Sequence, residues 1–113
     1  MRAETLKGHL DGMLLAVLET DPRHGYAIME ALRAGSGGQF DLPTGTVYPA
    51  LHRLERAGLI EASWSVHGGR RRRLYQLTPD GQGALAAERR TWHSFSSAVT
   101  ALLRAPAPAA SPP

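Results

Sequence analysis

The stretch TGTVYPALHRLERAGLI, residues 44–60, decides the expected fold. Its apolar residues Val47, Leu51 and Leu54 recur at intervals of four and three, which is typical of one buried face of a helix. Gly58 follows this pattern and ends the helix, because glycine is the usual residue just past a helix C-terminus. A basic helix of about three turns is therefore predicted in the middle of the chain.

The residues allow two starts for this helix. A threonine oxygen can accept hydrogen bonds from the free N–H groups of a first turn, and a proline is tolerated only close to a helix start. Pro49 therefore favours Thr46 as the capping residue, with Thr44 and a slightly irregular start as the alternative. The outer face would then carry Pro49, His52, Arg53 and Arg56.

Two shorter helices are predicted upstream, over residues 6–18 and 25–33, from the same spacing of apolar side chains. Pro22 separates them, and a glycine-rich turn over residues 35–38 ends the second. The connector 39–43 alternates apolar and polar residues and could add a strand at a sheet edge.

Downstream, residues 60–66 and 73–78 alternate as two strands of a hairpin, with a turn at 67–70. The alternation predicts that one face of the hairpin is packed inward, with Trp64 on its hydrophobic underside. The inward set is Ile60, Ala62, Trp64, Val66, Tyr75 and Leu77.

A final helix is predicted from Thr78-Pro79-Asp80, which supplies a capping hydroxyl, a proline at the first position and an acid in the first turn, to about Arg104. Its apolar residues follow the seven-residue rhythm of a helix-on-helix seam. This candidate dimer interface is Leu85, Trp92, Phe95, Val99 and Leu102. We expect one compact domain over residues 1–78, a dimerisation helix over 79–104 and a disordered Pro/Ala-rich tail over 105–113.

Composition excludes several classes of function. The 113 residues contain no cysteine, so disulfides, thiolate zinc sites and cysteine nucleophiles are excluded. The five histidines lack metal-ligand spacing, and no phosphate loop, nucleophile elbow or carboxylate pair indicates an enzyme. Neither a signal peptide nor a membrane-spanning apolar run is recognisable, so we expect a cytoplasmic protein without a cofactor or a metal.

The distribution of charge is more informative than the net charge of +3. Four arginines, residues 70–73, follow two glycines in the predicted hairpin turn. Guanidinium groups bind phosphate in a fixed fork geometry, so this block indicates a polyanionic partner.

Three helices, a hairpin and a further helix form a winged helix-turn-helix with a dimerisation helix. In that mainly α fold the third helix would enter the major groove, and the hairpin would reach flanking phosphates or the minor groove.

The residues also resemble those of the PadR transcriptional regulators. The resemblance covers roughly residues 6–103, and its specificity comes from the order and spacing of short motifs. These motifs are Lys7-Gly8, His24-Gly25-Tyr26-Ala27-Ile28, Gly45-Thr46-Val47-Tyr48-Pro49-Ala50-Leu51, Arg53-Leu54-Glu55-Arg56-Ala57-Gly58-Leu59-Ile60, Trp64, Gly69-Arg70, Tyr75-Gln76-Leu77-Thr78, Gly81 and Trp92.

This resemblance implies a homodimeric repressor that binds double-stranded DNA at a pseudo-palindromic operator. Its C-terminal helices would pack across the two-fold axis. The implied DNA contacts are Tyr26, Thr44, Thr46, Tyr48, Arg53, Arg70, Arg71 and Arg72. The wing is richer in arginine than is typical of the family, which leaves open which of its four arginines touch DNA.

Several residues have two interpretations. His52 faces solvent or phosphate more readily than a base edge. Arg53 could pair with Glu30 or Glu55, although DNA contact is favoured, and Arg56 is the arginine we assign to an intramolecular pair. Trp92 either fills the dimer seam or lines an apolar pocket that stacks a small aromatic or hydrophobic effector. The alternative function is a winged-helix module whose arginines bind an acidic protein.

Overall fold

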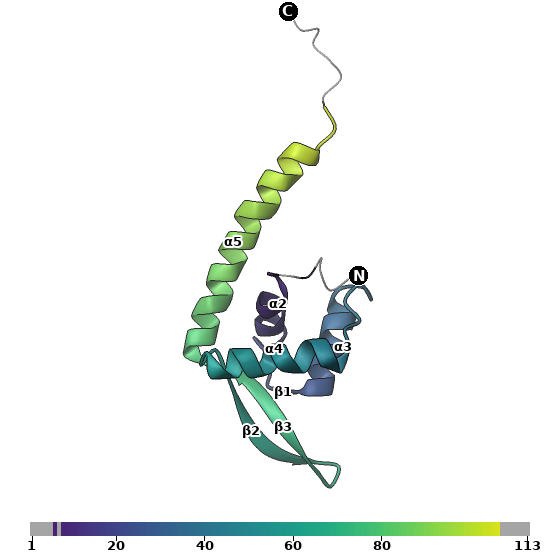
Figure 1. The fold of residues 1–113 in the computed structure, drawn as a ribbon, viewed down its shortest axis with the longest axis vertical. Helices are drawn as coiled ribbons and strands as arrows, with labels where there is room; N and C mark the ends of the chain where they lie inside the picture. Colours follow the sequence, from purple (N-terminus) through teal and green to yellow (C-terminus); the bar gives the residue numbers. More distant parts are fainter. Residues whose placement is uncertain (1–5, 7, 107–113) are drawn as a thin grey trace, which may run out of the picture.

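The computed structural model describes residue 6 and residues 8–106 (Figure 1). Helices and short strands alternate along the chain, and the strands form one small sheet. The long last helix projects from the compact part. The elements are α2 (Leu10–Val17), β1 (Arg23–His24), α3 (Gly25–Gly35), α4 (Thr44–Arg56), β2 (Ile60–His67), β3 (Arg70–Leu77) and α5 (Pro79–Leu103). The architecture is the mainly helical winged helix expected from the sequence, with a C-terminal helix.

The core lies where α2, α3 and α4 meet the base of the hairpin. Leu14, Ile28, Leu51 and Ile60 come from these four elements and are each at most 1% exposed. Each such side chain stabilises the fold by about 1.5–3 kcal/mol relative to an exposed one. Leu85 joins the same cluster at 3% exposure. We expected Leu85 at a dimer interface, but it is buried within a single chain and leaves almost no surface for a partner.

The sheet has the order β1-β3-β2 and is antiparallel throughout. The hairpin turns at Gly68 and Gly69, whose φ angles of +58° and +76° suit glycine. Strands β1 and β2 form the two edges, and residues 39–43 form no strand, so the edge strand expected there is wrong. That connector instead turns Leu42 into the core and packs Phe40 against it, so its apolar residues serve the helices.

The starts of two helices differ from expectation. Gly8, with φ of +86°, lies in a turn, so the regular part of the first helix begins at Leu10 rather than at residue 6. Helix α4 begins at Thr44 with Pro43 as its N-cap and no side-chain cap, so the expected capping role of Thr46 is wrong. The carbonyl of Pro43 accepts from the amides of Thr46 and Val47. Pro49 consequently lies in the second turn.

The hairpin extends far beyond the core. Strand β3 begins at Arg70 rather than at residue 73, and β2 extends to His67. Trp64 and Val66 are 57% and 74% exposed, so the expectation that they pack inward is wrong. The alternation correctly places them on one face with buried Ile60, but the core ends before it reaches them.

The start of α5 is confirmed. The Thr78 hydroxyl accepts from the amide of Gly81 (3.0 Å) and donates to the carbonyl of Gly58 (2.6 Å). The first half of α5 lies beside α2, and the second half projects away from the compact part (Figure 1). The tail expected to be disordered lies outside the described residues from residue 107 onward.

Candidate nucleic-acid interface

A groove of about 320 Å³ lies between the start of α3, helix α4 and the hairpin. It brings together Tyr26, Tyr48, Arg70, Arg71 and Arg72 from the sequence-predicted set. His24, Gly25, Arg73 and Tyr75 complete its walls. The groove therefore combines three phenols, a helix start and a concentration of positive charge, which together suit a phosphate backbone.

The N-terminus of α3 opens toward this groove. His24 is the N-cap and its side chain makes no capping hydrogen bond, so the helix start is open to an external acceptor. A Cβ atom on Gly25 would lie 2.1 Å from the Tyr48 hydroxyl oxygen. Only glycine therefore allows the Tyr48 phenol to reach the start of α3. There the hydroxyl and the free backbone amides can donate hydrogen bonds to the same anion.

Tyr75 forms the inner wall of the groove and is 2% exposed. Burial raises the pKa of its phenol, and this outweighs the opposing effect of the nearby Arg73 guanidinium. The phenol therefore stays neutral at physiological pH and adds no negative charge where a phosphate would bind.

Two of the wing arginines contact an aromatic ring. The guanidinium carbon of Arg71 lies 4.6 Å from the centroid of Trp64, and that of Arg73 lies 5.3 Å away. Arg73 also donates to Glu55 of α4 at 2.8 Å. This ion pair ties the hairpin to α4.

The outer face of α4 is exposed and adjoins this groove. The exposed residues there include Thr44, Gly45, Pro49, His52 and Arg56, and Thr46 is half-buried. Thr44, Thr46, His52 and Arg53 lie along the helix rather than in the groove itself. They follow the outer surface that a major groove would cover.

The arginine assignments on α4 need correction. Arg53 lies at the edge of the exposed face and pairs with Asp11 of α2 at 2.5 Å, not with Glu30 or Glu55. The other ion pairs among the described residues are Arg33–Glu30, Arg73–Glu55 and Arg89–Glu19. Arg56, to which we assigned an intramolecular pair, is in none of them.

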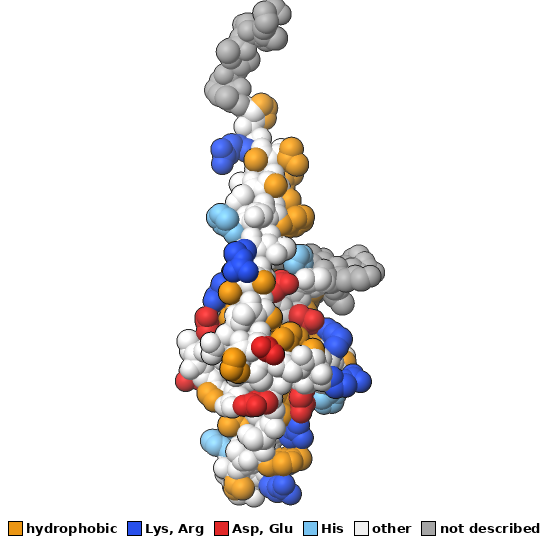
Figure 2. Space-filling model, turned by 90° about the vertical axis from the view of Figure 1, so that its left-hand side faces the viewer, with side chains coloured by type: hydrophobic (Ala, Val, Ile, Leu, Met, Phe, Trp, Pro, Cys, Tyr) orange, Lys and Arg blue, Asp and Glu red, His pale blue; other side chains and the backbone are white. Residues whose placement is uncertain are grey.

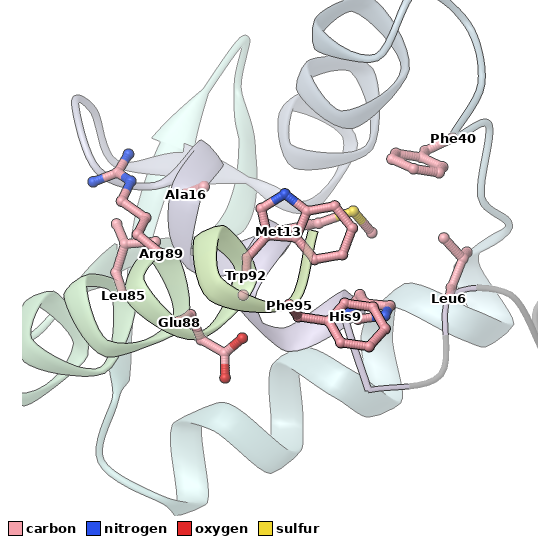
Figure 3. Close-up of a pocket in the computed structure, with 11 residues that line it drawn as sticks. Leu6, His9, Met13, Ala16, Phe40, Leu85, Glu88, Arg89, Trp92 and Phe95 are labelled. Carbon is pink, nitrogen blue, oxygen red and sulfur yellow. The ribbon is translucent and has the colours of Figure 1, made fainter. Parts of the chain in front are cut away.

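A second, apolar cavity of about 570 Å³ lies between α2 and the middle of α5 (Figure 3). Trp92 and Phe95 line it and are 53% and 54% exposed. His9 meets the Trp92 ring edge-on, with centroids 5.2 Å apart. The other lining residues are Leu6, Gly12, Met13, Ala16, Phe40, Leu85, Glu88 and Arg89.

An ion pair links the connector after α2 to α5 beside this cavity. Arg89 donates two hydrogen bonds to the Glu19 carboxylate, at 2.7 and 2.8 Å. These hydrogen bonds lower the pKa of Glu19 below its usual value and raise that of Arg89. Because Asp11 pairs with Arg53 of α4, the α2 region is linked by charge both to α4 and to α5.

The family model described as "Transcriptional regulator PadR-like family" matches residues 14–87, which include every element from the middle of α2 to the start of α5. The chain belongs to this family. It is a DNA-binding transcriptional regulator and not an enzyme.

Similar solved structures include a PadR family transcription regulator from Clostridium difficile, with 30% identity and a TM-score of 0.77 over 86% of this chain and all of that one. A PadR-like transcriptional regulator from Bacillus cereus gives 27% identity and a TM-score of 0.80 over 92% of this chain and 100% of that chain. A transcriptional regulator of Mycobacterium tuberculosis is 46% identical over 55 residues, 49% of this chain and 51% of that protein.

Some features of this PadR-like regulator were missed by sequence reasoning. His24 and Gly25 lie in a motif that marked the family, but their place in the groove became visible only with Tyr48 packed against them. The Asp11–Arg53 pair joins residues 42 positions apart and has no local signal. Within the described part of the chain, no group of three or more metal-ligating side chains occurs, and no helix there could span a membrane.

Proposed function

We propose that this PadR-like regulator is a homodimeric repressor that binds a pseudo-palindromic operator in the cytoplasm. One observation carries the proposal: the basic groove beside α3 directly adjoins the exposed outer face of α4. A duplex that places α4 in its major groove would present its backbone phosphates to that groove. Repression, rather than activation, follows from the family resemblance.

The contacts divide between phosphate and base edges. Tyr26, Tyr48, Arg70 and Arg72 would hold phosphates at the groove, with the amides at the start of α3. Thr44, Thr46 and His52 would lie in the major groove, and Arg53 would reach it on leaving Asp11. The Arg53–Asp11 pair is exposed at both ends and contributes at most about 1 kcal/mol, so a DNA phosphate can displace it.

The second copy of the chain would cover the apolar edge of α5. Trp92, Phe95, Leu102 and Leu103 are 53–85% exposed in the single chain. Figure 2 shows hydrophobic side chains along one edge of the upper helix and basic ones along the other. Burying the apolar edge against its symmetry mate would remove it from water and set the half-site spacing at about one helical turn of DNA or a small multiple.

The cavity beside Trp92 supports release by an effector. Its lining is mostly apolar and aromatic, so it suits a small flat hydrophobic molecule stacked on the Trp92 ring. Such a molecule would press on α2 and α5 and change the spacing of the two recognition helices in the dimer.

The test is binding of the purified protein to the DNA upstream of its own gene. Fluorescence anisotropy with random competitor DNA should show tight binding that falls steeply as salt rises, because arginines displace counterions from phosphates. Affinity equal to that for random DNA would contradict sequence specificity at this operator. No binding at low salt would overturn the proposal and favour an acidic protein partner for the wing.

Replacing Asp11 by asparagine should strengthen DNA binding. Asp11 occupies Arg53 in the free protein and adds a negative charge beside α4. Arg53 then no longer has to leave a carboxylate to reach DNA, and one repulsion with the phosphates is removed, so affinity should rise while the slope of log K against log salt stays near that of wild type. We expect affinity for random DNA to rise about two- to fivefold at low salt, measured by anisotropy.

Glu19→Gln is the matched control, because it removes one carboxylate and one arginine pair on the side of α5. It should change affinity less than Asp11→Asn does. Equal gains in both variants would assign the effect to net charge. Weaker binding by Asp11→Asn would instead mean that Asp11 holds Arg53 in its DNA-binding position.

A further inference from the structure

The hairpin exposes an aromatic side chain that neither the core nor the groove beside α3 uses. Trp64 is 57% exposed, and Val66, two residues on, is 74% exposed. Leaving such side chains in water sacrifices the stabilisation that burial would provide. Their exposure near the tip of the wing indicates a role outside the monomer core.

The register of the hairpin shows which arginines share this face. Trp64 lies opposite Arg73, and Val66 lies opposite Arg71, so these four side chains project on the same side of the sheet. Arg70 and Arg72 alternate onto the other side. The four-arginine block therefore divides into two pairs, and only one pair contacts Trp64.

The two arginines on the Trp64 face have different surroundings. Arg73 is held by Glu55 at 2.8 Å, and its Nε is enclosed without a hydrogen-bond partner. Its charge is balanced, and it fixes the wing against α4. Arg71 is exposed, and among the described residues it pairs with no carboxylate. It lines the groove beside α3, and its guanidinium carbon lies 4.6 Å from the centroid of the Trp64 ring. The ring orients the guanidinium without neutralising it.

We propose that Trp64 is a positioning residue for Arg71 and that the oriented Arg71 reads the minor groove beside the site of α4. Arginine is attracted into narrow, A·T-rich minor grooves, where the negative potential is strongest. An arginine held on a ring face enters such a groove with less loss of side-chain entropy than a free one. The inference rests on the proposed DNA binding and assigns different work to Arg71 and Arg73.

Three 30-base-pair duplexes test this assignment: one of A·T pairs, one of G·C pairs and one of I·C pairs. Inosine lacks the 2-amino group of guanine, so I·C presents the minor-groove edge of A·T and the major-groove edge of G·C. Wild type should prefer both A·T and I·C over G·C. Trp64→Leu and Arg71→Lys should each lower that preference about two- to fivefold, the range expected for an exposed cation–π contact.

Two controls separate positioning from structure. Trp64→Phe keeps an aromatic face and should keep most of the preference. Arg70→Lys changes a proposed phosphate contact on the other face, so it should weaken binding to all three duplexes by the same factor and leave their ratio unchanged. The ¹⁹F spectrum of fluorotryptophan-labelled protein reports directly on the surroundings of Trp64. The chain has only two tryptophans, so the resonance that disappears in Trp64→Phe belongs to Trp64. The Trp64 signal should shift more with the A·T duplex than with the G·C duplex.

The outcomes distinguish this inference from the proposed function. Wild type that binds all three duplexes without preference overturns the minor-groove role and leaves DNA binding intact. Equal loss of affinity for all three in Trp64→Leu, with an unchanged melting temperature, overturns the positioning role. No binding to any duplex at low salt overturns both.

Discussion

Replacing Gly81 by alanine should lower the free energy of unfolding by about 3 kcal/mol, at the upper end of the usual cost of overpacking. A Cβ atom at this position would lie 1.9 Å from the carbonyl oxygen of Leu59 and 3.1 Å from Leu77 Cδ2. The obstacle is backbone, so no side-chain rotation can relieve it. The same carbonyl accepts from the Thr78 amide, so moving it would also disturb the start of α5.

Gly83→Ala is the matched control for this prediction. Gly83 lies one residue beyond Gln82 in the same helix, and a Cβ there would meet nothing within 4 Å. Alanine should stabilise α5 by up to about 1 kcal/mol, because its helix propensity is higher than that of glycine. Thermal unfolding at equal protein concentration should therefore shift in opposite directions, with Gly81→Ala melting about 10 °C or more below wild type. A Gly81→Ala protein that melts with wild type would contradict the close packing of α5.

The order of elements could be predicted from the sequence because its signals are local. The spacing of Val47, Leu51 and Leu54 marked α4, and Thr78 with Pro79 marked the start of α5. The edge strand could not be predicted, since β1 has two residues and is defined by its pairing with β3. Alternation likewise fixed the face on which Trp64 lies but not where the core ends.

For the candidate site, the sequence predicted most residues of the groove but not the ion pairs around it. Tyr26, Tyr48 and the wing arginines follow from family motifs, and the structure places them around one groove. Electrostatic partners were not predictable, because Asp11 and Arg53 meet only when α2 packs against α4. The division of labour between Arg71 and Arg73 depends on strand register and on Glu55, which the sequence does not reveal.

Replacing Phe95 by glutamate should convert the proposed dimer into a monomer. Phe95 is 54% exposed beside Trp92, with ring centroids 6.0 Å apart, on the edge of α5 that we assign to the second copy. A carboxylate there would lose its hydration on association without gaining a partner. Light scattering after gel filtration should report the mass of a dimer for wild type and of a monomer for the variant.

The same substitution should weaken binding to a palindromic operator about 100-fold, because two linked half-site contacts gain this much over one. Ser97→Glu adds the same charge two residues away, where the helical repeat turns it from the Phe95 edge, and should leave both mass and affinity near wild type. A dimeric Phe95→Glu protein with intact affinity would place the interface elsewhere. Loss of the dimer with unchanged affinity would mean that each chain binds DNA alone, and the half-site spacing would then no longer follow from α5.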